Sequence, residues 1–128
     1  MTAVLEQTLK APLGVFTDEV TDDRGRVNVR LLAQALDLPM TTIAPALALK
    51  PRWLNANPTG QSFQPKAVIL LELVNELATV LGGKKYVVLY LKTEQPDFAD
   101  ETPAEQLKKG RLQFLRSYVH DVATQRPD

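Results

Sequence analysis

The strongest hydrophobic pattern in the chain lies between residues 63 and 81, where apolar residues recur at helical spacing. The main apolar stripe consists of Phe63, Ala67, Leu70, Leu71, Val74, Leu77, Ala78 and Leu81. Further apolar residues widen the stripe until only a narrow polar band remains, formed by Glu72, Asn75, Glu76 and Thr79. The pattern predicts a long helix that begins near Ser62 and ends at Gly82-Gly83, because glycine suits a left-handed cap. Such a helix either packs on two sides within one chain or gives part of its surface, including Leu70, Val74 and Leu77, to a homodimer interface.

Two shorter helices are predicted before the long one. Asn28 can cap a helix over VRLLAQAL, which ends at Asp37-Leu38-Pro39. We expect Thr42 to cap the next helix, over IAPALALK, because Pro45 is tolerated only within a first helical turn. The pair has the outline of a helix-turn-helix. Residues 1–27 contain turn-forming sequences and are predicted to form an arm and a turn.

The last third of the chain alternates short helices with turn-forming segments. The sequence predicts a helix from Lys84 to Lys92, followed by an extended acidic stretch that carries one aromatic residue, Phe98. Thr102-Pro103-Ala104-Glu105 has the pattern of a capping box, and Gly110 ends the helix that this box begins. A final helix covers RLQFLRSYVHDV, where Phe114 and Tyr118 lie at the edge of the apolar stripe. These two aromatic residues either belong to the core or face a partner protein.

Composition and charge narrow the class of protein. The chain has 128 residues, of which 45% are hydrophobic, so one folded domain with an all-α core is expected. Fifteen basic residues balance fifteen acidic ones, so no overall charge favours nucleic acid or an anionic membrane. No secretion signal or membrane span is predicted, and the absence of cysteine fits a cytoplasmic protein. We divide the chain into an arm (1–27), a helix-turn-helix-like and dimerisation region (28–82) and a C-terminal region (83–128).

The sequence offers little catalytic or metal-binding chemistry. The segment TDDRG resembles a calcium-binding loop, but Val20 and Arg24 occupy positions that need oxygen ligands. His120 is the only histidine, and it falls on the polar side of the last helix, where a solvated role is expected. LGGKKY lacks the spacing of a phosphate-binding loop. We therefore expect no enzyme activity, no cofactor and no metal site.

A family resemblance enters with the C-terminal motifs. Tyr90-Leu91-Lys92-Thr93, Pro96, Phe98, the Thr-Pro-x-Glu box and Gly110 resemble the toxin-binding domain of Xre/MbcA/ParS-type antitoxins. Residues 22–50 also resemble the Xre-like helix-turn-helix of that family. The chain departs from the family pattern where Tyr90 replaces tryptophan, Glu94 replaces proline and Phe98 replaces leucine.

The resemblance implies a cytoplasmic all-α antitoxin that forms a homodimer and binds a cognate RES-domain toxin, which consumes or transfers ADP-ribose from NAD. Inhibition by occlusion of the toxin's active site is expected. On this interpretation the capped helix at Thr102 holds the preceding loop in place. The predicted toxin-binding residues are Phe98, Arg111, Phe114, Arg116, Tyr118, Gln125 and Arg126. The alternative for the arginines is an ordinary solvated helix face.

The resemblance also implies possible binding to operator DNA, since many such antitoxins repress their own genes. The segment after the helix pair, ALKPRWLNANP, is short and offers only Lys50 and Arg52 as nearby cations. We expect Trp53 to fill the core beneath the helix pair rather than to contact bases. A helix-turn-helix transcriptional regulator that acts alone is the alternative function.

Overall fold

The computed structural model describes residues 13–125 and shows an all-α fold, as predicted. The α-helices are α2 (Thr17–Val20), α3 (Val29–Leu36), α4 (Met40–Ala46), α5 (Pro51–Ala56), α6 (Gln64–Leu81), α7 (Lys84–Leu91), α8 (Pro103–Lys108) and α9 (Leu112–Thr124). Two short 3-10 helices, η1 (Gln61–Phe63) and η2 (Pro96–Phe98), precede α6 and α8. Residues 13–125 contain no β-strand, only two isolated bridges. None of their helices combines the length and apolar character that a membrane crossing requires.

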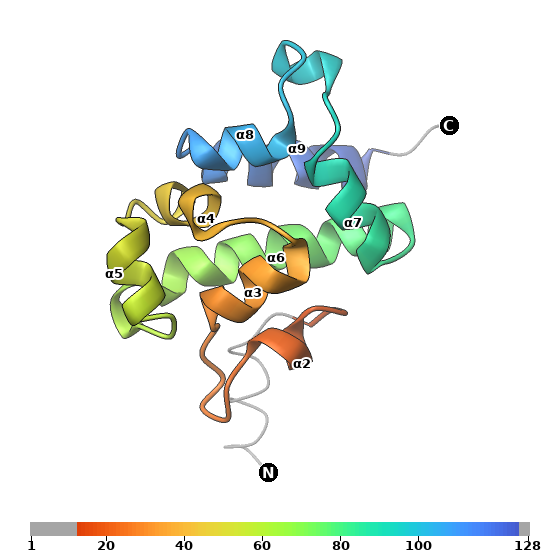
Figure 1. The fold of residues 1–128 in the computed structure, drawn as a ribbon. Helices are drawn as coiled ribbons and strands as arrows, with labels where there is room; N and C mark the ends of the chain where they lie inside the picture. The colour runs from red at the N-terminus through yellow and green to blue at the C-terminus, as the bar shows by residue number, and fades with distance from the viewer. Residues whose placement is uncertain (1–12, 126–128) are drawn as a thin grey trace.

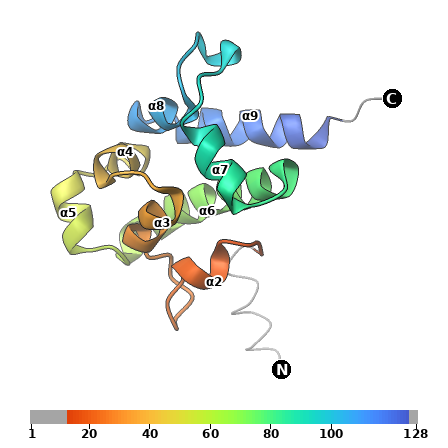
Figure 2. The same ribbon diagram turned by 45° about the vertical axis from the view of Figure 1, so that its right-hand side comes forward.

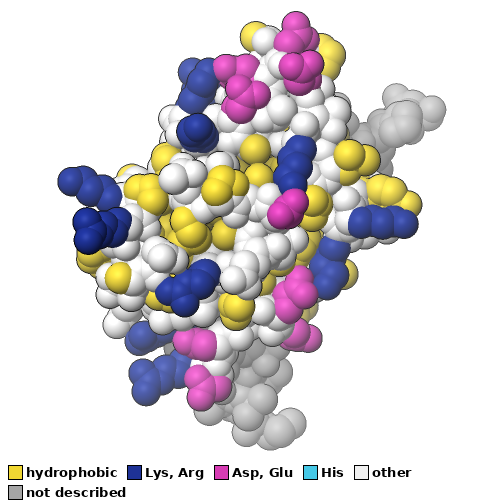
Figure 3. All heavy atoms as spheres, viewed as in Figure 1, with side chains coloured by type: hydrophobic (Ala, Val, Ile, Leu, Met, Phe, Trp, Pro, Cys, Tyr) yellow, Lys and Arg dark blue, Asp and Glu magenta, His cyan; other side chains and the backbone are white. Residues whose placement is uncertain are grey.

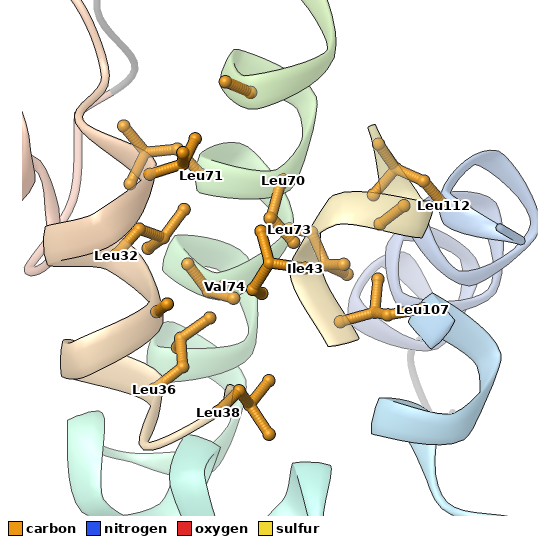
Figure 4. Packing of buried hydrophobic residues seen from close by; sticks show 14 of the residues in the cluster. Leu32, Leu36, Leu38, Ile43, Leu70, Leu71, Leu73, Val74, Leu107 and Leu112 are labelled. Carbon is orange, nitrogen blue, oxygen red and sulfur yellow. The ribbon is translucent and has the colours of Figure 1, made fainter. Parts of the chain in front are cut away.

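Helix α6 lies at the centre of the fold and is covered from two sides (Figures 1 and 2). Figure 4 shows α6 between α3, which contributes Leu32, and α4, which contributes Ile43. The most extensive contacts of α6 are with α9. Leu70, Val74 and Leu77 are at most 4% exposed within the chain. The interpretation that α6 packs on two sides within one chain is therefore confirmed, and these three residues cannot form an exposed dimer face.

Local sequence signals set several helix ends. The Asn28 side chain accepts hydrogen bonds from the backbone amides of Arg30 (3.0 Å) and Leu31 (3.2 Å), so the predicted cap is confirmed. Gly82 ends α6 with φ of 92°, in the left-handed region that glycine favours.

The predicted cap of α4 is wrong. Helix α4 begins at Met40, after Pro39, and Thr42 lies inside its first turn. Pro45 is consequently near the end of α4 rather than in the first turn. Because proline has no amide hydrogen to donate, the helix loses one bond there, and it ends at the next residue, Ala46.

The predicted N-terminal arm is partly core. Phe16 and Val20 are fully buried, although both fall in the segment assigned to an arm and a turn. The amide of Phe16 donates to Asn75 Oδ1 at 3.0 Å, and Asn75 Nδ2 donates to Thr17 Oγ1 at 3.1 Å. Asn75, expected in the solvated band of α6, is only 5% exposed. Its amide group joins α2 to α6. Residues 1–12 of the predicted arm lie outside the described residues.

A close approach of the backbone explains the glycine before α2. A Cβ atom added at Gly14 would lie 2.2 Å from Asn75 Cγ, well inside van der Waals contact. Only glycine lets the chain pass so close to α6. The segment between α2 and α3 then turns at Asp22, whose Oδ1 accepts the amides of Arg24 and Arg26 at 2.9 Å each. This carboxylate is occupied by backbone contacts, in a turn rather than a calcium loop.

The three predicted segments share one hydrophobic cluster, which includes Phe16, Leu70 and Leu107. Helix α4 packs more extensively against α8 than against α3, its partner in the predicted helix-turn-helix. The N-terminal helix pair and the C-terminal region are therefore built around a common core.

Candidate protein-binding surface

The connection between α7 and α8, residues 92–102, projects from the helical body as a closed loop (Figures 1 and 2). We call it the α7–α8 loop. The Gln95 amide donates to the Glu101 carbonyl at 2.9 Å and closes the base of the loop. Ala99 and Asp100 take positive φ angles of 54° and 67°. Non-glycine residues cost about 1–2 kcal/mol each in this region, so contacts within the protein must hold the loop in this shape.

Aromatic contacts anchor the loop on α9. The ring of Phe98 lies 4.8 Å from that of Tyr118 and 5.7 Å from that of Phe114, both in edge-on arrangements. Such pairs contribute about 0.5–1.5 kcal/mol beyond simple burial. Phe98 is only 5% exposed, so its predicted role as a partner-facing residue is wrong. It holds the loop, and the neighbouring residues form the surface that a partner can reach.

A hydrogen bond adds a polar anchor beside the rings. The Tyr118 hydroxyl donates to Asp97 Oδ2 at 2.6 Å. This bond, together with burial and the carboxylate charge, raises the pKa of Tyr118 to about 12. Burial, and then the charge of Asp97, also raise the pKa of Tyr90. The Tyr118 hydroxyl therefore keeps its proton and remains a donor to the loop throughout the neutral pH range.

The C-terminal end of the loop is fixed by the predicted capping box, which is confirmed. Thr102 Oγ1 accepts the Glu105 amide at 3.1 Å, and Glu105 Oε1 accepts the Thr102 amide at 3.0 Å. Both bonds satisfy amides at the start of α8 that have no partner inside the helix. The box therefore sets the direction in which the chain enters α8.

Gln106, which the sequence did not single out, connects the loop to the start of α9. Its Nε2 donates to Glu101 Oε1 at 2.7 Å, and its Oε1 accepts Arg111 Nη1 at 3.1 Å. Glu101 also pairs with Lys109. The hydrogen bonds from Lys109 and then Gln106 lower the pKa of the Glu101 carboxyl. Gln106 is 1% exposed, so a buried amide stands between two charged groups.

Arg111 and Phe114 form an exposed ridge at the start of α9, and each lines two hollows. We call them the Arg111–Phe114 ridge. One hollow, of about 420 Å³, lies beside the α7–α8 loop. The other, of about 340 Å³, we call the α4–α9 groove; it is lined by residues that include Pro45, Ala48, Lys66, Gly110, Arg111 and Phe114. Phe114 is 49% exposed, so a large part of its apolar ring faces solvent. The ridge is the part of the predicted site that a partner can contact directly.

The remaining predicted toxin-binding residues lie elsewhere. Arg116 Nη1 pairs with Glu76 Oε1 at 2.9 Å, and His120 Nδ1 lies 3.2 Å from the other oxygen of the same carboxylate. Arg116 is thus half-buried against α6 and already has a partner. Gln125 follows the end of α9, roughly 20 Å from the ridge at 1.5 Å per residue. Arg126 lies outside the described residues. The structure therefore brings together Phe98, Arg111, Phe114 and Tyr118 and leaves the others apart.

A second exposed region surrounds α5. Lys50, Arg52 and Trp53 are all exposed, and Trp53 is 44% exposed with its ring edge-on to Phe63 at 6.1 Å. The expectation that Trp53 fills the core is wrong, because Phe63 occupies the buried position beneath it. Lys and Arg side chains gather around α5, whereas Asp and Glu side chains gather over the α7–α8 loop (Figure 3).

Within residues 13–125, no cluster of three histidine or carboxylate side chains could hold a metal ion. Comparison of the chain with family models, curated proteins and solved structures gives no match.

Proposed function

We propose that this chain is an antitoxin that binds a RES-domain toxin and neutralises it by covering the toxin's active site. The observation that carries the proposal is the α7–α8 loop, which projects from the body yet is held by aromatic and polar contacts on α9. A projecting segment fits the entrance of a cleft in a partner. The resemblance of the same segment to antitoxin sequences supports this assignment.

Rigidity gives the loop an energetic role in binding. A mobile segment loses conformational entropy when a partner orders it, about 0.5–1.5 kcal/mol for each immobilised side chain. The Phe98 and Asp97 contacts impose that order before binding. The Arg111–Phe114 ridge beside the loop then supplies an aromatic residue and an arginine, the two residue types that most often dominate protein interfaces.

The proposal includes a cytoplasmic location and a homodimer. Since Leu70, Val74 and Leu77 are buried, the dimer interface must use other residues. Val80 and Val122 are 46% and 45% exposed and line one shared hollow between α6 and α9. This is the apolar surface on which we place the dimer contact.

The function is tested by substitution on α9. Removal of residues 111–128 is unsuitable, because it would take the buried residues Leu112, Leu115 and Val119 out of the core. Phe114→Asp instead places a charge on an exposed position. We expect it to abolish protection against the RES-domain protein encoded by an adjacent reading frame, with unchanged circular dichroism.

Leu31→Asp is the matched control, because Leu31 is likewise an exposed apolar residue, 40% exposed, and lies on α3, outside both the α7–α8 loop and α9. We expect this variant to protect as the original chain does. Full protection by Phe114→Asp would contradict the proposed surface, and lack of protection by the original chain would contradict the antitoxin function.

Operator binding is the second candidate, supported by the exposed cations around α5. Lys50 and Arg52 take part in no ion pair found in residues 13–125. We expect weak binding to DNA upstream of the gene, with affinity that falls steeply as salt is added. If the chain causes no mobility shift of this DNA even at low salt, the role in repression is wrong. A stand-alone regulator would bind without any RES-domain neighbour, so the genomic neighbourhood separates the two functions.

A further inference from the structure

The α4–α9 groove combines an apolar wall with a cationic rim. Its wall is formed by side chains without hydrogen-bonding groups, including Pro45, Ala46, Ala48 and Leu112. Its charged lining residues are Lys66, from the first turn of α6, and Arg111, from the start of α9. No aspartate or glutamate lines the groove. Although the chain carries no net charge, both charged residues that line this groove are cations.

The two cations have unequal internal partners. Lys66 is exposed and makes no ion pair or side-chain hydrogen bond with any residue the structure describes. The Arg111 guanidinium donates a hydrogen bond to the neutral Gln106 side chain. It also interacts electrostatically with Glu101, a carboxylate that is already paired with Lys109. Arg111 keeps donors that can point into the groove, and Lys66 keeps all three of its own. The groove thus offers positive charge that the chain itself does not use.

We propose that the α4–α9 groove binds an acidic segment of the partner protein, with carboxylates on Lys66 and Arg111 and an apolar residue against Phe114. This inference rests on the proposed function and names the chemistry of the partner's contact. An arginine can hold a carboxylate through two parallel hydrogen bonds, which fixes orientation as well as charge. An apolar residue between the carboxylates would cover the half-exposed Phe114 ring.

A protein segment fits this groove better than a nucleic acid does. Apart from Gln113, the uncharged lining side chains cannot hydrogen-bond to bases, and a phosphate backbone would need a longer track of cations. An acidic segment with apolar residues satisfies both the rim and the wall. Arg111 and Phe114 also belong to the ridge, so the groove extends the proposed interface towards α4.

The test is charge reversal at Lys66. Lys66→Glu places a carboxylate in the first turn of α6, where a negative charge favours the helix, so the variant should fold. Arg24→Glu makes the same change of charge on an exposed residue in the turn between α2 and α3, away from α9 (Figure 1). We expect Lys66→Glu to raise the Kd for the RES-domain protein about tenfold or more, and to flatten its salt dependence. Arg24→Glu should change the Kd by less than about twofold.

The outcomes of that experiment distinguish a failure of the groove proposal from a failure of the proposed function. Unchanged affinity of Lys66→Glu, with tight binding by the original chain, would remove the groove from the interface and leave the antitoxin function intact. Absence of binding by the original chain would overturn the proposed function. Similar weakening by Lys66→Glu and Arg24→Glu would reduce the effect to general electrostatic attraction and overturn a specific site.

A second measurement needs no toxin. A ten-residue peptide of glutamate with two leucines is added to the isotopically labelled full chain, and amide shifts are followed by NMR. We expect shifts at residues 45–48 and 110–114, and their loss in Lys66→Glu. A ten-nucleotide DNA strand is the comparison. Stronger shifts of these amides with DNA than with the peptide, or no shifts with either, would overturn the proposal.

Discussion

Asn75 and Gln106 are both buried amide side chains that join a peripheral segment to the helical body, but their partners differ. Asn75 is bonded to the backbone amide of Phe16, a fully buried residue, and to Thr17. Gln106 is bonded to Glu101 and Arg111, whose charged groups reach solvent at the edge of the fold. When an amide is removed, a buried partner has no water to replace it, and an exposed partner does. The partner's access to water therefore decides how much each amide contributes.

The largest effect is expected at Asn75. Asn75→Ala should lower the free energy of unfolding by about 2–3 kcal/mol, because it leaves the Phe16 amide buried without an acceptor and opens a small cavity. Urea denaturation followed by circular dichroism measures this loss. Thr79→Ala, one turn along α6 at an exposed position, is the control and should change stability by less than about 0.5 kcal/mol. Equal effects of the two substitutions would show that the buried Asn75 amide contributes no more to stability than an exposed side chain on the same helix.

A smaller effect on stability is expected at Gln106. Gln106→Leu keeps the volume of the side chain but removes two hydrogen bonds: the one that Gln106 donates to Glu101 and the one that it accepts from Arg111. Since water can solvate both charged partners, the free energy of unfolding should fall by only about 1 kcal/mol. The local effect should be larger, and hydrogen exchange of amides in the α7–α8 loop should become faster. Gln113→Leu, on the exposed surface of α9, is the control. A loss of stability as large as that of Asn75→Ala would show that water does not replace the Gln106 amide as the partner of Glu101 and Arg111.

The smallest effect at neutral pH is expected at Tyr118. Tyr118→Phe removes one hydrogen bond to the exposed Asp97 and should cost less than about 1 kcal/mol. Its clearer signature is in the alkaline range. The pKa of Tyr118 is raised from 10.0 to about 12, so between these values the folded chain keeps a proton that the unfolded chain has lost. Stability from this bond is complete below pH 10 and is lost as the pH rises through about 12.

The measurement for Tyr118 is the ultraviolet absorbance of tyrosinate during an alkaline titration. The original chain has three tyrosines, and we expect Tyr118→Phe to remove the component with the highest pKa. If the last step of the titration survives in Tyr118→Phe, the hydrogen bond to Asp97 is not present in solution.

The features that the sequence predicted are those that depend on neighbours along the chain. The Asn28 cap, the Thr102–Glu105 box and the glycine end of α6 each need only a few adjacent residues, and all three are confirmed. The α4 cap failed because Pro39 also suits the residue before a helix, and the sequence alone could not rank it against Thr42.

The features that could not be predicted depend on contacts between distant segments. Nothing near Asn75 shows that Phe16 will bring a buried amide to it across 59 residues. Phe98 has the local sequence of an exposed loop residue, and only the position of α9 buries it. The assignment of Leu70, Val74 and Leu77 to a dimer failed for the same reason, because α3, α4 and α9 supply the covering surface within one chain. Lys66 carries no local signal at all, since its groove is assembled from three separate helices.

The exposure of Trp53 determines what intrinsic fluorescence can report. It is the only tryptophan in the chain, and it sits against Phe63 where α5 meets the start of α6. Emission will therefore respond when a ligand such as an oligonucleotide covers this edge, while docking at the far end of the α7–α8 loop leaves the indole untouched. Tryptophan fluorescence can in this way distinguish a ligand bound at the surface around Lys50, Arg52 and Trp53 from one bound at the α7–α8 loop, with no added dye.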